Sequence, residues 1–137
     1  MRHATEAYGK IGRQTGNPRE LEANLLLDAA ARLQAIRDGW NERPDLQAAL
    51  TNNRHLWSIL ATSATNPENP LPVGLRQNVA NLGIFVFKQT LAILADPKPE
   101  KLDSLIRINR ELAAGLISNA RPEPLSPANG RTAYYFR

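Results

Sequence analysis

Few side chains in this sequence could carry out catalysis. The two histidines are His3, close to the N-terminus, and His55, and there is no cysteine. His55 and Ser58 stand three positions apart, a spacing at which a helix places a base beside a nucleophile. No carboxylate is placed to orient the imidazole, so we interpret His55 as a half-buried, hydrogen-bonded side chain. The sequence therefore predicts no catalytic residue and no enzyme.

A metal or cofactor site is not indicated either. Zinc sites built on thiolates are excluded without cysteine, and one histidine without clustered carboxylates is not a metal site. Gly74 and Gly83 lie inside helical patterns rather than in a phosphate-binding loop after a strand. The acidic residues fall mostly in the first turns of expected helices, where their interaction with the helix dipole explains them. We expect no metal and no cofactor.

Length and composition indicate one globular domain. The chain has 137 residues, of which 42% are hydrophobic and 22% charged, values close to globular averages. The N-terminal residues contain no apolar run of the signal-peptide kind, and Lys88 interrupts the longest apolar stretch. We therefore expect a cytoplasmic protein that does not cross a membrane.

Prolines mark the starts of the helices. Asn17 is the expected N-cap of a helix that begins at Pro18 and stops at Gly39. Further helices are expected over residues 44–65, 72–95 and 99–119, with a short one over residues 4–14 before them all. No strand alternation is visible. The predicted fold class is all-α: a compact bundle of four to five helices within residues 1–120, followed by a flexible, Pro-rich tail over residues 121–137.

The second of these long helices carries a seam of side chains that belong in the core. Its apolar positions step by three or four residues and include Trp57, which we assign to the core. Asn53 lies in the same seam, where a polar group is costly unless it finds a partner. Asn109 occupies a similar position in the last helix. The sequence therefore predicts a hydrogen-bonded core contact for Asn53.

The third long helix is apolar nearly all round. It shows three groups of apolar side chains: Leu75, Val79, Leu82, Val86 and Ile93 on one face, Ile84, Phe87, Leu91 and Leu94 on another, and Phe85 pointing a third way. Such a helix is either central in a bundle or covered by a partner, and a domain this small can hardly enclose it. A rigid loop containing Pro67, Pro70 and Pro72 leads into it. We expect part of this helix to be a binding surface.

Four short motifs follow one another in this part of the chain. "NRHLWSIL" fits an Asn/Thr-Arg-x-Leu-Trp-x-x-Leu helix motif, and "NPLPVGLR" fits Asn-x-Leu-Pro-x-x-Leu-Arg with Pro70 inserted. "LGIFV" has Phe85 at a position that is more often Trp, and "LDSLIRINRELAAGL" fits a closing pattern of Leu, Ile, Asn and Gly-Leu. In this order the motifs resemble FlaF, a family of flagellar biosynthesis regulators of alphaproteobacteria. The resemblance spans residues 4–120.

The resemblance implies a non-enzymatic regulator of flagellin synthesis and export. It implies a dedicated secretion chaperone that binds flagellin and works alongside the translational regulator FlbT. An exposed apolar helix face suits capture of the amphipathic terminal helices of flagellin. Arg76 is expected to pair with an acidic residue of the partner. The full set of expected contact residues comprises Pro70, Leu71, Pro72, Arg76, Ile84, Phe85, Val86 and Leu91.

The alternative is an RNA-associated regulator of flagellin translation that acts with or through FlbT. The net charge of +4 favours it. The charge is spread, however: residues 121–137 supply +2 through three arginines and one glutamate, and no run of Lys or Arg occurs. Direct nucleic-acid binding is therefore not the expected activity. Direct binding predicts an affinity that falls steeply with salt.

Overall fold

The computed structural model describes residues 17–42 and 45–120. Within these ranges the chain forms α-helices and 3-10 turns and no strand, so the predicted all-α bundle is confirmed. The elements are α2 (Pro18–Asp38), η1 (Trp40–Glu42), α3 (Leu46–Ala64), α4 (Val73–Ala95), η2 (Pro99–Leu102) and α5 (Asp103–Ala120). The short helix expected over residues 4–14, the helix start expected at Pro44 and the tail over 121–137 lie outside the described residues.

Local sequence sets the ends of α2. The Asn17 side-chain oxygen accepts hydrogen bonds from the backbone N–H groups of Arg19, at 3.0 Å, and Glu20, at 3.3 Å. These bonds satisfy two of the N–H groups that a helix start leaves without partners. At the other end, the Gly39 N–H donates to the Ala35 carbonyl at 3.0 Å. Both predicted ends of this helix are confirmed.

The last helix differs from its prediction at its start. The segment that begins at Pro99 forms the short 3-10 helix η2, and the α-helix begins only at Asp103. Asp103 is held there by Arg37 of α2, which donates to both of its carboxylate oxygens. The Arg37 pKa is raised by this hydrogen bond and by the charge of Asp103. The ion pair thus joins the end of α2 to the beginning of α5.

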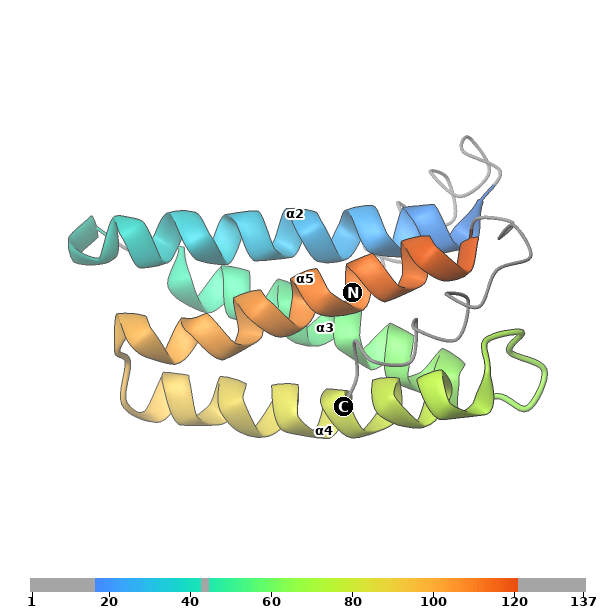
Figure 1. The fold of residues 1–137 in the computed structure, drawn as a ribbon. Coiled ribbons are helices and arrows are strands. Elements are labelled where there is room, and N and C mark those ends of the chain that lie inside the picture. The colour runs from blue at the N-terminus through green and yellow to red at the C-terminus, as the bar shows by residue number, and fades with distance from the viewer. Residues whose placement is uncertain (1–16, 43–44, 121–137) are drawn as a thin grey trace.

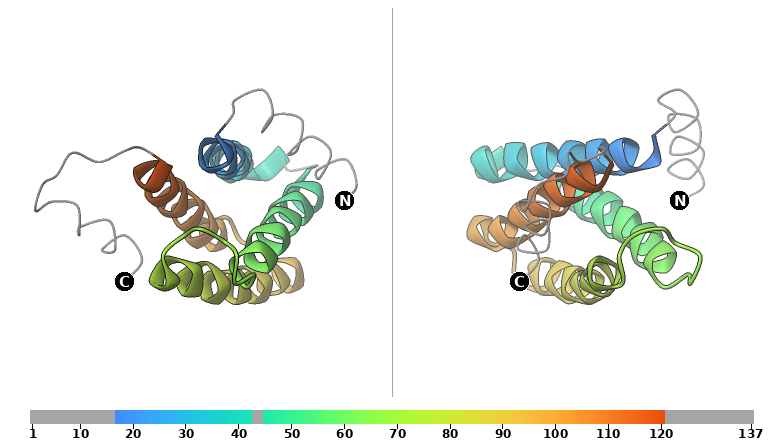
Figure 2. Two further views of the ribbon diagram at one scale, coloured as in Figure 1. Left: turned by 90° about the vertical axis from the view of Figure 1, so that its right-hand side faces the viewer. Right: turned by 45° about the vertical axis from the view of Figure 1, so that its right-hand side comes forward.

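The four α-helices of the described residues pack in a way that leaves α4 partly uncovered. Helix α2 packs along α5, α3 packs along α4, and α2 also meets α3, whereas α4 meets α5 over a short stretch. Figures 1 and 2 show α2 and α4 on opposite sides of the bundle, with α3 and α5 between them. One side of α4 is therefore covered by the bundle, and no other helix of the described residues packs on the opposite side.

A polar cluster lies inside the core where α2, α3 and α5 meet. The side-chain nitrogen of Asn109 donates to Oδ1 of Asn53 at 2.7 Å and to the Leu26 carbonyl at 3.3 Å. Both asparagines are fully buried, so these bonds offset the cost of removing the Asn109 nitrogen and the Asn53 oxygen from water. The side-chain nitrogen of Asn53 has no hydrogen-bond partner among the described residues. The predicted hydrogen bond to Asn53 is confirmed, as is the core position of Trp57.

Candidate partner-binding surface

Helix α4 has a buried side and an exposed apolar side. The buried side consists of Leu75, Val79, Gly83, Val86, Thr90 and Ile93. The exposed large hydrophobic side chains of this helix, with their exposed fractions, are Val73 (61%), Ile84 (55%), Phe85 (39%), Phe87 (36%), Leu91 (67%) and Leu94 (45%). Ile84, Phe87, Leu91 and Leu94 share one helix face, which we call the α4 apolar face. A group of this kind on one helix is typical of a binding surface.

A close contact with α3 determines which side of α4 faces outward. A Cβ atom added to Gly83 would lie 3.1 Å from Cβ of Ala61, so the two helices approach closely at this point. Thr90, also on the buried side of α4, donates from its hydroxyl to the Val86 carbonyl at 2.7 Å. Its polar atom is thereby satisfied without water. The α4 apolar face cannot turn inward without breaking this packing.

An open groove runs between α3 and α4. It has a volume of about 550 Å³ and is lined by Arg54, His55 and Ser58 of α3 and by Phe87 and Leu91 of α4. Neither α3 nor α4 contains an aspartate or a glutamate. The groove is therefore apolar on its α4 side and polar, with a cation, on its α3 side.

His55 and Ser58 do share this groove, as their spacing predicts. His55 is half-buried, also as predicted, and Ser58 is exposed. A nucleophile and a base need a third group to orient the base, and no carboxylate comes from either helix that lines the groove. Among the described residues no group of three or more His, Cys, Asp or Glu could hold a metal ion. The groove has the chemistry of a docking surface.

The expected contact residues on α4 separate into two groups. Ile84, Phe85 and Leu91 are exposed and accessible to a partner, and their contact with one stays a prediction. The prediction for Val86 is wrong, because its side chain is fully buried. Position 86 lies on the buried side of α4, which packs on the bundle.

Sequence reasoning missed several residues of this surface. Phe87 and Leu94 lie on the α4 apolar face but were not among the expected contacts. Their spacing of three positions from Ile84 and Leu91 indicates that they share that face. Arg54 was also missed as a wall of the groove. The absence of carboxylates from both helices could have pointed to it.

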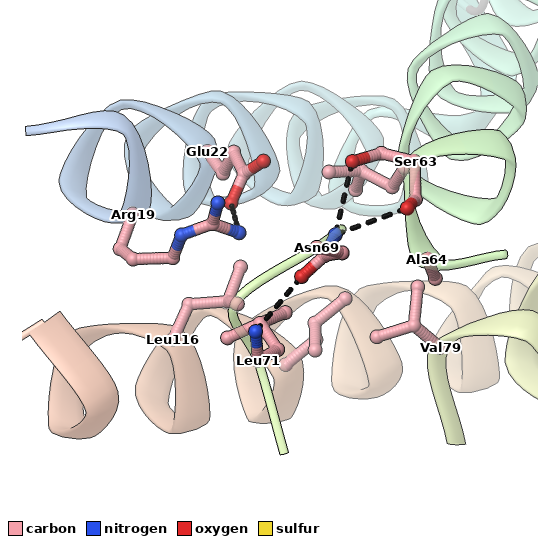
Figure 3. Close-up of a pocket in the computed structure, with 10 residues that line it drawn as sticks. Arg19, Glu22, Ser63, Ala64, Asn69, Leu71, Val79 and Leu116 are labelled. Atoms are coloured by element: carbon pink, nitrogen blue, oxygen red, sulfur yellow. Dashed lines mark hydrogen bonds and ion pairs between the residues drawn. The ribbon is translucent and has the colours of Figure 1, made fainter. Parts of the chain in front are cut away.

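The Pro-rich loop before α4 is anchored to the bundle by Asn69 (Figure 3). The Asn69 side-chain nitrogen donates to the carbonyl and to the hydroxyl of Ser63, both at 3.0 Å. Its oxygen accepts from the backbone N–H of Leu71 at 2.9 Å. The cavity at this place has a volume of about 10 Å³, which is the room of about one water molecule. This cavity is too small for a ligand, and the residues around it serve to pack the loop against the bundle.

The expected contact residues of the loop lie in different environments. Pro70 and Pro72 are exposed, whereas Leu71 is half-buried and packs against the core. Arg76 donates to the Asn66 carbonyl at 3.2 Å, so it already braces the loop from within the chain. Leu71 and Arg76 thus help to hold the loop in place, and a partner would meet chiefly the two prolines.

By length and composition alone, α4 is apolar enough to cross a membrane. Of the described residues only this helix passes the test, which mostly buried core helices also pass, whereas 28% of the apolar window of α4 is buried. Here α4 packs on α3 through Gly83 and carries Arg76 and Lys88. The membrane test thus reflects the apolar composition of α4. The expectation that the protein does not cross a membrane stays a prediction.

Comparison with known proteins identifies the family. A family model described as "Flagellar protein FlaF" matches residues 4–116. The chain belongs to the FlaF family. The FlaF match covers all of α2, α3 and α4 and most of α5, so it includes the α4 apolar face and the groove. No curated protein and no solved structure gives a significant match. This FlaF chain is therefore a flagellar protein, as its motifs indicate.

Proposed function

We propose that this FlaF protein is a non-enzymatic, cytoplasmic regulator of flagellin synthesis and export that binds flagellin as a secretion chaperone. The observation that carries the proposal is the α4 apolar face. Among the described residues, every exposed large hydrophobic side chain except Leu27 lies on α4. Exposed apolar area concentrated on one helix is costly in water and is typical of a surface that a partner covers.

The chemistry of the partner fits this surface. Flagellin has long amphipathic terminal helices that are disordered before assembly, as the FlaF resemblance implies for the cargo. A segment that folds on binding loses conformational entropy, which moderates its affinity and permits release. A chaperone that covers the apolar stripe of such a segment would keep flagellin soluble until export. Bound flagellin would also report its own level, which links export to synthesis through FlbT.

Calorimetry with purified flagellin tests the proposal. The double variant Ile84→Ala/Leu91→Ala removes two exposed side chains of the α4 apolar face and should weaken flagellin binding at least about tenfold. Leu27→Ala is the control, since Leu27 is exposed on α2 at the opposite side of the bundle; its affinity should equal that of the wild type. Circular dichroism checks that all variants are folded. Absence of binding between flagellin and the folded wild type at micromolar concentration would overturn the proposal.

The RNA-binding alternative draws on one specific observation. Arg54, Arg76 and Lys88 lie on two helices that carry no carboxylate. Three phosphate contacts on single-stranded RNA predict a decrease of log K with log salt of about 2. A gel shift with a flagellin leader transcript across salt concentrations, with and without FlbT, measures this slope. Binding by the protein alone with such a slope, and no binding of flagellin, would replace the chaperone proposal by the alternative.

A further inference from the structure

We infer that the groove between α3 and α4 takes an amphipathic helix that packs on α4 as the second strand of a coiled coil and carries acidic residues on both flanks of its apolar stripe. The inference rests on the proposed function and specifies which kind of flagellin segment is held.

The spacing of the α4 apolar face is that of a coiled-coil seam. Ile84, Phe87, Leu91 and Leu94 are separated by three, four and three positions, which places them at successive a and d positions of a heptad. Val73, also exposed, lies two heptads before Phe87 and so continues the row of d positions. The row of d positions from Val73 through Ala80 to Leu94 is roughly 32 Å long at the rise of an α-helix, with the polar Gln77 at one a position. A seam of this kind fits one further helix, aligned within about 20° of α4.

Positive charges lie on both flanks of the seam. Arg54, on α3, lines the groove together with Phe87 and Leu91. Lys88 directly follows the d position at Phe87 and is exposed, so it stands on the flank of the seam away from Gly83 and α3. Neither helix offers a carboxylate to neutralise these cations. Charges at such flanking positions select the partner of a coiled coil, and here they select glutamate or aspartate.

Two other occupants carry the wrong charge. Residues 121–137 of this chain have a net charge of +2, which would bring further cations to a surface that already has Arg54 and Lys88. A second copy of the chain, seated seam to seam, would place Lys88 of each copy near the cations of the other. Like charges at these positions oppose pairing. The complementary occupant is an acidic helix from another protein.

Two synthetic peptides test this inference. Both are designed helices of about 21 residues, or three heptads, a length that matches the seam. They share the same Leu/Ile residues at the a and d positions and the same alanine-rich remainder. One peptide has Glu at its e and g positions, and the other has Lys there. Each peptide is fluorescently labelled and kept at nanomolar concentration, so that it does not pair with itself, while the full-length protein is titrated in. We expect the Glu peptide to bind at least about tenfold more tightly than the Lys peptide at low salt.

A charge-reversal pair identifies the groove as the place of binding. Arg54→Glu/Lys88→Glu should reverse the preference, so that the Lys peptide binds more tightly. Arg32→Glu/Arg110→Glu makes the same change in net charge at exposed positions of α2 and α5 and should keep the preference for the Glu peptide. Circular dichroism tests whether each variant is folded, and analytical ultracentrifugation measures its oligomeric state.

The outcomes separate this inference from the proposed function. Equal binding of the two peptides, or a preference that the control pair reverses as well, would overturn it. So would binding of flagellin with no binding of either peptide, although the chaperone proposal would then stand. If the wild type forms a dimer and Leu91→Ser abolishes it, a second copy of the chain is the occupant of the groove. If removal of residues 121–137 makes the peptides bind more tightly, that segment is the occupant. If neither peptide nor flagellin binds, both proposals fail.

Discussion

The indole nitrogen of Trp57 donates a hydrogen bond of 2.8 Å to Oδ1 of Asn109, a residue 52 positions further along the chain. Asn109 in turn donates to Asn53 and to the Leu26 carbonyl. The cluster therefore ties α3 to α5 and to α2 in the middle of the core. Both partners of the indole bond are fully buried, so neither can find a replacement in water.

Removing the indole donor should destabilise the protein. Trp57→Phe leaves the Asn109 oxygen buried without its donor and creates a small cavity, so we expect a loss of about 2–4 kcal/mol in the free energy of unfolding. Urea denaturation followed by circular dichroism measures it. Because the groove lies outside the core, the folded fraction should still bind flagellin. A loss below about 0.5 kcal/mol would contradict the assigned role of this bond.

Exposure on α4 should separate effects on stability from effects on binding. Val86 is fully buried, so Val86→Ala should cost about 1.5–3 kcal/mol of stability. Leu91 is 67% exposed, so Leu91→Ala should change stability by less than about 0.5 kcal/mol and weaken flagellin binding instead. Urea midpoints and calorimetry on the same preparations test both. Equal destabilisation by the two substitutions would show that the α4 apolar face is covered within the monomer.

The close approach of α3 and α4 should make position 83 intolerant of larger side chains. A Cβ on Gly83 already lies 3.1 Å from Ala61 Cβ, so Gly83→Val must push the helices apart and should cost about 1–3 kcal/mol. Gly74→Ala is the matched substitution on the same helix, since a Cβ there meets no atom within 4 Å. It should stabilise by about 0.4–1 kcal/mol. Thermal unfolding would refute the contact if both variants gained stability.

Asp96 should make the end of α4 sensitive to acid. A hydrogen bond from Lys101, at 3.3 Å, and the charges of Lys101 and Lys98 hold the pKa of Asp96 below its ordinary value of 3.8. Because the unfolded chain takes up this proton at a higher pH, the contribution of Asp96 is complete above the unfolded pKa and is lost as pH falls through the lower folded pKa.

Urea midpoints of the wild type and Asp96→Asn across the acid range measure this contribution. The wild type should be the more stable protein at neutral pH, and the difference should disappear as the pH falls below about 4. Added salt should reduce it, because Asp96 is exposed. A difference that stays constant with pH would show that the carboxylate charge plays no part. Lys98→Gln leaves the hydrogen bond from Lys101 to Asp96 in place and should therefore retain most of the pH-dependent contribution of Asp96.

Local patterns were enough to predict the helices and part of the core. An N-cap at Asn17 and prolines at helix starts act within a few residues, so α2, α3 and α4 lie where the sequence indicates. The hydrogen bond to Asn53 could also be predicted from the sequence, since a buried amide needs a partner. The start of α5 was placed too early, because proline at a first position suits a 3-10 turn and an α-helix alike.

The candidate surface could be predicted only in part. Helical spacing showed that α4 has more apolar side chains than one buried face can hold, and it separated the face of Val79 from that of Leu91. It did not show which side α3 would cover, and Val86 was therefore counted among the contact residues although it shares the face of Val79. Arg54 lies in sequence far from Leu91 and reaches the groove only because α3 and α4 pack together.

The amino-acid sequence by itself determined that this chain is a helical FlaF protein and that one of its helices is too apolar for so small a bundle, because caps, prolines and side-chain periodicity act locally. Only the tertiary structure decided that much of the excess stays exposed, with Arg54 of α3 beside it. The physical reason is that burial depends on which neighbour covers a surface, and α4 has α3 on one side and no helix of the described chain over the other.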